Sequence, residues 1–192
     1  MSFLLDTNVV SEWVKPRPEP NVREWLAEVD EDTVWLSVIT FAEIRLGIDR
    51  MPPGRRRTAL GAWLENDLPA RFEGRIIGIG LGIADAWGKL MARCARQGRT
   101  VGAMNGFIGA IALAQGFTLV TRNTEDFAPL GIPVLNPWPP YRWKPFLLAG
   151  SSPPSRIGKL GSGRRTLKKG PRSRRRWARV HLTVQKPPFC DR

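Results

Sequence analysis

Short apolar runs alternate along the chain with stretches in which apolar residues recur every three or four positions. Runs of this length are typical of buried strands, and they occupy residues 3–5, 34–38, 76–79, 118–121 and 132–135. The wider spacing is typical of helices, and it covers residues 9–14, 22–29, 40–48, 57–68, 84–97 and 104–115. Strands separated by helices favour a parallel sheet with helices on both faces. The sequence therefore predicts the α/β class.

Residues that favour helix starts mark two of the predicted helices. Thr40 and Glu43 have the spacing of a capping box, so we expect Thr40 to cap the helix over residues 40–48. Asp85 lies where the helix over residues 84–97 begins, and we expect it to act as a cap there.

The charge of the chain changes sharply near residue 140. Residues 1–140 hold 15 basic and 16 acidic side chains, whereas residues 141–192 hold 15 basic ones and the single acid Asp191, so the two parts carry about −1 and +14. The second part is rich in Pro, Gly and Ser, and it lacks the apolar periodicity that could offset the entropy of ordering. We expect one domain over residues 1–138, followed over residues 139–192 by a basic tail that is disordered.

The basic tail admits two interpretations. Clustered Arg and Lys would bind RNA or DNA without sequence preference, through neutralisation of phosphates. Alternatively, the tail is a readthrough or frameshifted extension that has no selected role, and we favour this second interpretation. In either case its charge adds nonspecific affinity for nucleic acid.

Several protein classes are excluded by what the chain lacks. Cys94 and Cys190 are the only cysteines, which is too few for a disulfide framework or a Cys-based zinc site. The first residues do not have the basic and apolar regions of a signal peptide. No apolar run reaches the roughly 18 residues of a membrane span. We therefore expect a cytoplasmic protein without membrane contact.

Acidic residues occur where predicted strands end. Asp6 follows the first strand, and Glu125 and Asp126 follow the strand over residues 118–121. Ligands of a parallel sheet collect at the carboxyl ends of its strands, so these acids can converge, together with Glu43. Structural roles are the alternatives: Asp6 as a helix cap and Glu43 as the partner of Thr40.

Converging carboxylates repel each other unless a cation neutralises them, and an oxygen-only set suits Mg²⁺ or Mn²⁺. The single histidine, His181, lies in the tail. Zinc catalysis and catalytic triads therefore lack their components in the predicted domain.

Four segments of this chain together resemble PIN-domain ribonucleases of the VapC/FitB toxin type, which belong to toxin–antitoxin systems. They are FLLDTNVVSE at residues 3–12, TFAEIRLGI at 40–48, QGRTVG at 97–102 leading to VTRNTEDF at 120–127, and VLNPW at 134–138. The resemblance covers residues 2 to 138. It implies a PIN-like three-layer α/β/α fold with a central parallel sheet.

The resemblance also implies a metal-dependent endoribonuclease that hydrolyses RNA phosphodiesters with Mg²⁺ or Mn²⁺. Asp6 matches the first metal-binding acid of the family and Glu43 the second. Asp126 lies in the region that supplies the last acid, and Asn123 is close enough to take that role instead. Arg122 lies near the same region, either as a phosphate contact or as a solvated surface charge.

Asn105 departs from the family pattern, because Asp is usual at this metal-binding position. An amide oxygen can coordinate a metal but brings no negative charge, so metal affinity and water activation should fall. Three explanations stay open: an impaired natural variant, an engineered change, or a site that tolerates the amide. Outside the resemblance, Asn105 followed by Gly106 is a common helix cap or turn.

The resemblance further implies a cognate antitoxin protein and a homodimer, in addition to the RNA substrate. The alternative is a catalytically weak PIN fold that binds its antitoxin or RNA. A phosphatase of the haloacid-dehalogenase type also begins with a strand followed by Asp. It requires a second Asp two positions later, where this chain has Asn8.

Overall fold

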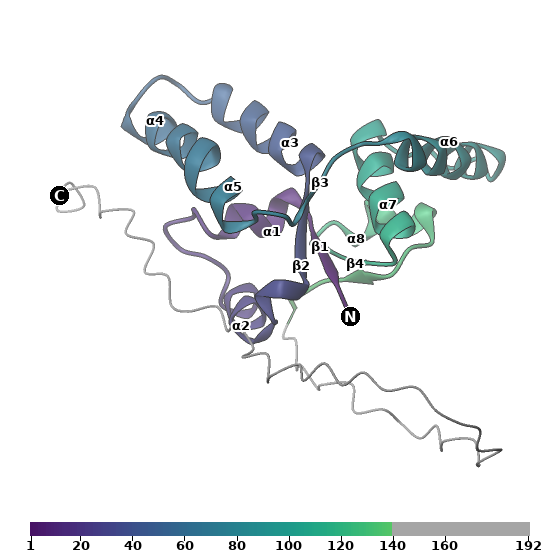
Figure 1. Ribbon diagram of the computed structural model, residues 1–192, viewed down its shortest axis with the longest axis horizontal. Helices are drawn as coiled ribbons and strands as arrows, with labels where there is room; N and C mark the ends of the chain where they lie inside the picture. Colours follow the sequence, from purple (N-terminus) through teal and green to yellow (C-terminus); the bar gives the residue numbers. More distant parts are fainter. Residues whose placement is uncertain (140–192) are drawn as a thin grey trace, which may run out of the picture.

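Five short parallel strands form the centre of the structure (Figure 1), which is a computed structural model describing residues 1–139. Their order in the sheet is β3-β2-β1-β4-β5, and every neighbouring pair is parallel. The strands are β1 (Phe3–Leu5), β2 (Val34–Ser37), β3 (Ile76–Ile77), β4 (Thr118–Val120) and β5 (Val134–Leu135). All five predicted strands are therefore present, the later ones shorter than expected.

Helices cover both faces of this sheet, as predicted (Figure 1). One layer holds α1 (Thr7–Glu12), α2 (Pro20–Glu28), α3 (Val38–Asp49), α4 (Arg55–Ala62) and α5 (Leu68–Arg71). The other layer holds α6 (Leu81–Arg96), α7 (Ala103–Gln115) and α8 (Thr124–Phe127). Short 3-10 turns occur at Glu31–Thr33 and Ala128–Leu130. The architecture is the three-layer α/β/α sandwich that the resemblance implies.

The alternation of side chains along β1 divides the apolar core in two. Phe3 and Leu5 pack into the cluster under α1, α2 and α3, whereas Leu4 packs into the cluster under α6 and α7. Successive strand residues point to opposite faces of a sheet, and all three side chains are at most 5% exposed. Strands buried on both faces read as continuous apolar runs, which is why the sequence revealed them.

The helix predicted over residues 57–68 is observed as three segments: α4, a π-helical stretch at Trp63–Asp67, and α5. Pro69 lies in α5 and has no N–H to donate, so a regular α-helix cannot run through this position. The N–H of Leu68 bonds to Trp63, five residues earlier. The short helix α8 was not predicted.

Both predicted helix caps are wrong. The hydroxyl of Ser37 caps α3 and accepts from the N–H of Thr40 at 3.0 Å, so α3 begins earlier than predicted. Thr40 lies inside the first turn, where its hydroxyl donates to the carbonyl of Leu5 at 3.3 Å. Gly80 is the cap residue of α6, and Asp85 lies inside that helix and pairs with Lys89 at 2.7 Å.

Helices α6 and α7 pack closely because α7 has glycine at the contact. A Cβ atom at Gly106 would lie 2.7 Å from the sulfur of Met91 and 2.8 Å from Nε1 of Trp87. Trp87 stacks on Phe107 with ring centroids 4.7 Å apart. This packing fixes the first turn of α7, which carries Asn105.

Gly109→Ala is expected to destabilise the fold by about 1–3 kcal/mol, because overpacking a filled core forces its neighbours to move. The added Cβ would lie 2.4 Å from Cδ1 of Leu130, which is fully buried. Gly88→Ala in α6 is the matched control, since nothing lies within 4 Å of its Cβ position. It should stabilise the protein by up to about 1 kcal/mol. Urea unfolding of both variants measures the difference, and equal stabilities would contradict the packing described here.

Within residues 1–139, every helix is too short or too polar to cross a bilayer. The prediction that the basic tail is disordered concerns residues that, apart from Pro139, lie outside the described part of the chain.

Candidate active site at the carboxyl edge of the sheet

Asp6 lies at the carboxyl end of β1, in the middle of the sheet. Its backbone is extended, with φ −76° and ψ 160°, and its N–H donates to the carbonyl of Val120 in β4 at 3.0 Å. The residue is 6% exposed. Asp6 also occupies the cap position of α1, so the structural alternative for this residue is observed as well. The two roles are compatible, because a carboxylate oxygen can accept more than one contact.

Three donors hold the Asp6 carboxylate. The N–H of Thr7 donates to Oδ1 at 2.8 Å, while Asn8 Nδ2 and the Thr121 hydroxyl donate to Oδ2 at 2.7 and 2.6 Å. Thr121 immediately follows β4, so this contact joins the ends of two neighbouring strands. Asn8 Nδ2 also donates to the Thr121 hydroxyl at 2.9 Å. The side chain of Asp6 is therefore fixed in one orientation.

Burial raises the pKa of Asp6 above its ordinary value of 3.8. The hydrogen bonds from Thr121, Thr7 and Asn8 oppose this effect by stabilising the carboxylate, whereas the nearby charge of Glu43 raises the pKa further. A cation at this position would relieve both the desolvation and the repulsion. The electrostatics of the site therefore favour a positively charged ligand.

Glu43 reaches the same site from α3. Its Oε2 accepts a hydrogen bond from the Thr7 hydroxyl. Thr7 thus bridges the two acids, because its N–H binds Asp6 and its hydroxyl binds Glu43. The capping-box role for Glu43 is wrong, since this side chain faces α1 and not the start of its own helix.

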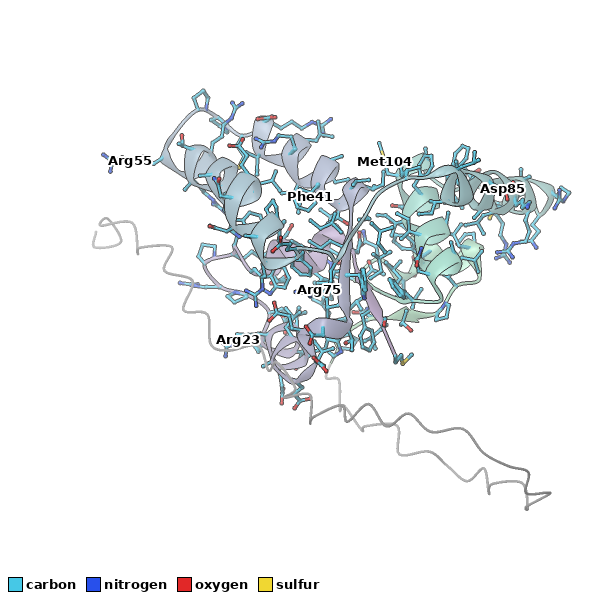
Figure 2. The ribbon with its side chains drawn as sticks, viewed as in Figure 1. Arg23, Phe41, Arg55, Arg75, Asp85 and Met104 are labelled. Carbon is cyan, nitrogen blue, oxygen red and sulfur yellow. The ribbon has the colours of Figure 1, made fainter. Side chains whose placement is uncertain are left out.

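Asn105 lies in the first turn of α7 and is partly exposed. Helices α3 and α7 are in contact, and Figure 2 shows Met104 at the end of α7 that lies nearest to α3. Leu4 packs into the cluster under α7, and Asp6, two positions later on extended backbone, points to the same face. The first turn of α7 and the Asp6 side chain therefore share one face of the sheet.

Asp126 lies in α8 and is exposed, outside the hydrogen bonds that join Asp6 and Glu43. Asn123 is closer to that network, because its N–H donates to the Thr121 hydroxyl at 3.0 Å. Residues 1–139 contain no group of three or more His, Cys, Asp and Glu side chains arranged to hold a metal ion. The structure thus brings two carboxylates together and adds amide and hydroxyl groups around them.

Thr121 was not singled out from the sequence. The available signal was its place at the end of the strand predicted over residues 118–121. The position of β4 beside β1 comes from the tertiary structure. Thr7 and Asn8 lie in the segment FLLDTNVVSE, which carries part of the family resemblance.

The donor set fits a hard divalent cation. Asp6 and Glu43 supply carboxylate oxygens, the ligand type that Mg²⁺ and Mn²⁺ prefer. Burial and the nearby Glu43 raise the pKa of Asp6, so a bound cation would stabilise its charged form. Two carboxylates are also a common protein contribution to a magnesium site, since Mg²⁺ keeps several of its waters.

A family model described as the PIN domain matches residues 3–131 of this chain. The chain belongs to the PIN-domain family. The family assignment inferred from the sequence motifs is therefore confirmed.

Two relatives align with this chain over almost their full length. VapC ribonuclease Y4jK of Sinorhizobium fredii is 38% identical over 138 residues, which is 72% of this chain and 99% of the relative. Toxin FitB of Neisseria gonorrhoeae is 35% identical over 136 residues, 71% of this chain and 98% of the relative. One of these relatives is named a VapC ribonuclease and the other the toxin FitB.

A solved structure agrees with this assignment. The structure of FitAB bound to the IR36 DNA fragment matches this PIN domain with a TM-score of 0.67 and 34% identity. The match covers 71% of this chain and 95% of the other chain.

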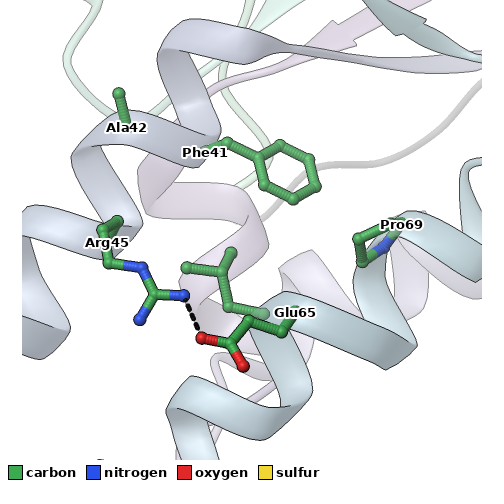
Figure 3. A pocket seen from close by; sticks show the side chains of 6 residues that line it. Phe41, Ala42, Arg45, Glu65 and Pro69 are labelled. Carbon is green, nitrogen blue, oxygen red and sulfur yellow. Dashed lines mark hydrogen bonds and ion pairs between the residues drawn. The ribbon is translucent and has the colours of Figure 1, made fainter.

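A groove lies between α3 and the segment formed by the π-helical stretch and α5 (Figure 3). Its lining residues are Phe41, Ala42, Arg45, Leu64, Glu65 and Pro69. Arg45 and Glu65 pair across the groove at 2.8 Å. Helix α3 therefore presents Glu43 toward α1 and Arg45 toward this groove.

Proposed function

We propose that this PIN domain is a metal-dependent endoribonuclease toxin of a toxin–antitoxin pair, and that it hydrolyses RNA phosphodiesters with Mg²⁺ or Mn²⁺. The observation that carries the proposal is the pairing of Asp6 and Glu43 through Thr7 at the carboxyl edge of the sheet. The relatives named ribonuclease and toxin support the RNA substrate and the biological role.

In this proposal Asp6 and Glu43 hold the cation, and Asn105 contributes its amide oxygen from α7. Either Asn123 or Asp126 completes the set. The backbone N–H of Asn123 donates to the Thr121 hydroxyl, which supports Asn123 because it places this residue next to the Asp6 network. The bound cation would neutralise the phosphodiester and lower the pKa of the attacking water. Thr7, Asn8 and Thr121 orient the carboxylates, so that little reorganisation is needed when RNA binds.

The proposed partners are a cognate antitoxin and a second copy of this chain, in the cytoplasm. A toxin–antitoxin complex from Klebsiella pneumoniae matches this chain with a TM-score of 0.51 and 26% identity. The structure of FitAcB from Neisseria gonorrhoeae also matches with a TM-score of 0.67 and 34% identity. These relatives support an antitoxin partner for this chain.

Metal removal tests the proposed activity. The full chain should cleave bulk RNA with Mg²⁺ or Mn²⁺, lose this cleavage in EDTA, and regain it when the metal is returned. Gel analysis of labelled RNA measures the outcome. Cleavage that persists unchanged in EDTA would refute a metal-dependent mechanism.

We also propose that residues 1–138 form an independent domain and that the tail contributes charge alone. Deletion of residues 141–192 should leave the unfolding midpoint within a few degrees, because the described part already contains both core clusters. Nucleic-acid binding should weaken with salt in the full chain and largely disappear on deletion, whereas cleavage should persist. Loss of folding or of cleavage on deletion would show that the tail belongs to the functional unit.

The second candidate function is a catalytically weak PIN fold that binds its antitoxin or RNA. The amide of Asn105 favours it, because this position lacks the carboxylate usual in the family. Metal-dependent cleavage that disappears in an Asp6→Ala variant would reject this candidate.

A further inference from the structure

Arg122 and Trp138 lie together just beyond the carboxyl edge of the sheet. Arg122 follows Thr121 after β4, and Trp138 follows β5, which pairs with β4 through Val120 and Leu135. The guanidinium carbon of Arg122 lies 5.7 Å from the centroid of the Trp138 ring. This distance is within the range of a cation–π contact.

The backbone of both residues is held in place. The N–H of Arg122 donates to Oδ1 of Asn8 at 3.3 Å, and the same Asn8 donates to Asp6. Trp138 donates its N–H to Asn136 at 3.0 Å and accepts from Asn21 at 3.0 Å through its carbonyl. Arg122 is therefore coupled directly to the residues that orient the candidate catalytic acid.

Arg122 differs from the cations that are paired with acids in the described part of the chain. Those ion pairs include Lys15–Glu12, Arg45–Glu65, Arg57–Asp49, Arg71–Glu31, Arg75–Glu31 and Lys89–Asp85. Within residues 1–139, Arg122 makes no ion pair with a carboxylate, and it is exposed. Its charge is available to an anion from solution.

A phosphate is the anion that this position suits. The carboxylates of Asp6 and Glu43 repel a polyanion, so an RNA strand needs a cation near the site to approach it. A guanidinium presents several N–H donors in a plane and binds phosphate oxygens well. The indole ring limits the freedom of the guanidinium, which lowers the entropic cost of fixing it on a phosphate.

We infer that Arg122 binds a backbone phosphate of the RNA strand beside the cleavage site, and that Trp138 positions its guanidinium. This inference rests on the proposed ribonuclease function. It assigns Arg122 to substrate binding and gives Trp138 an indirect, positioning role. The competing explanation is that the contact between Arg122 and Trp138 only stabilises the packing of the domain's last residues against the core, which Trp138 contacts.

The first test measures kcat/KM for a short single-stranded RNA with the full chain at several salt concentrations. This ratio is unaffected by nonproductive binding of the same RNA to the tail. Arg122→Ala should lower kcat/KM roughly tenfold or more. It should also reduce the slope of log kcat/KM against log salt by about 0.7, the value for one phosphate contact on a single strand.

Three further variants separate the explanations. Arg122→Lys keeps the charge and should keep the salt slope, while kcat/KM falls less than in Arg122→Ala. Trp138→Phe should lower kcat/KM slightly and also keep the slope. Arg96→Ala removes an exposed arginine from the last turn of α6. This helix covers the face of the sheet opposite to the core cluster against which Trp138 packs. The variant should change neither kcat/KM nor the salt slope. A lower unfolding temperature of Arg122→Ala with an unchanged salt slope would overturn the inference and show that the contact has only a structural role.

A second readout does not depend on cleavage. RNA that carries 4-thiouridine is crosslinked by light to the full chain, and the attachment sites are mapped by mass spectrometry. Crosslinks at Trp138 should be present in the unaltered chain and in Arg96→Ala but absent in Arg122→Ala, while crosslinks to the tail persist in all three. Crosslinks confined to the tail would overturn the inference.

The two readouts distinguish the inference from the function on which it rests. An unaltered chain that cleaves RNA, with unchanged kinetics in Arg122→Ala, retains the proposed function and rejects the role of Arg122. A chain that cleaves no RNA but crosslinks at Trp138 in an Arg122-dependent manner rejects the nuclease and retains the phosphate contact.

Discussion

Asp6→Asn is expected to reduce RNA cleavage by at least about 100-fold, because stabilisation by a bound cation is worth several kcal/mol in the transition state. The substitution keeps the size of the side chain but removes the charge. It also places an amide where three donors now meet a carboxylate. Cleavage of labelled RNA under single-turnover conditions measures the effect.

The matched control for Asp6→Asn is Asp85→Asn, which removes an exposed carboxylate from α6. This variant should cleave RNA at the rate of the unaltered chain. If Asp6→Asn cleaves equally well, Asp6 is not a ligand and the proposed site is wrong.

The dependence of stability on pH provides a separate readout for Asp6. Below its ordinary pKa of 3.8 the side chain is protonated in both the folded and the unfolded state, so its ionisation does not change the free energy of unfolding. As the pH rises toward the higher pKa of the folded protein, the unfolded state loses its proton first, and the free energy of unfolding falls. The metal-free protein should therefore lose stability relative to Asp6→Asn across this window and then reach a plateau.

Urea unfolding of both forms at pH values from 4 upward measures this difference. Added Mn²⁺ at neutral pH should restore the stability of the unaltered chain, because a ligand that binds the folded state alone stabilises it. Asp6→Asn should show a much smaller response. A constant stability difference at all pH values would contradict the raised pKa of Asp6.

Asn105→Asp is expected to increase both Mn²⁺ affinity and RNA cleavage, each roughly tenfold, because it adds a carboxylate to a hard-cation site. The stability of the metal-free protein should fall slightly, since the new charge repels Asp6 and Glu43. An acid in the first turn of α7 interacts favourably with the helix dipole, which offsets part of this loss of stability. Titration calorimetry, cleavage of bulk RNA and metal-free melting measure the three effects.

Gln115→Glu is the matched control, because it adds the same charge to the last turn of α7, far along the helix from Asn105. It should leave metal affinity and cleavage unchanged. If Asn105→Asp also leaves them unchanged while Asp6→Ala removes both, Asn105 lies outside the site. If neither form binds metal or cuts RNA, the PIN fold acts as a binding module.

The positions of the strands and the placement of helices on both faces of the sheet were predicted from the sequence. Residues 3–5 form an apolar run because β1 is buried on both faces, and its alternation assigns Leu4 and Leu5 to opposite layers. The place of Asp6 at the end of this strand, and the abrupt change of charge near residue 140, were also visible. Each of these features is a local property of the chain.

Local signals failed where a contact with a distant segment outweighed them. Thr40 and Glu43 have the spacing of a capping box, but Ser37 caps α3 and Glu43 binds Thr7 instead. The reason is that α3 packs against α1, which offers Glu43 a partner 36 positions away in sequence. A spacing rule describes one helix and contains no information about the element packed against it.

The assembly of the site was decided by the tertiary structure. The Thr121 hydroxyl donates to Asp6 across 115 positions because β1 and β4 are neighbours in the sheet, and the same pairing places Arg122 beside Asn8. The sequence by itself determined which side chains stand at strand ends. The order of the strands determined which of those ends meet, since hydrogen bonds between strands follow from packing of the whole chain and not from local preference.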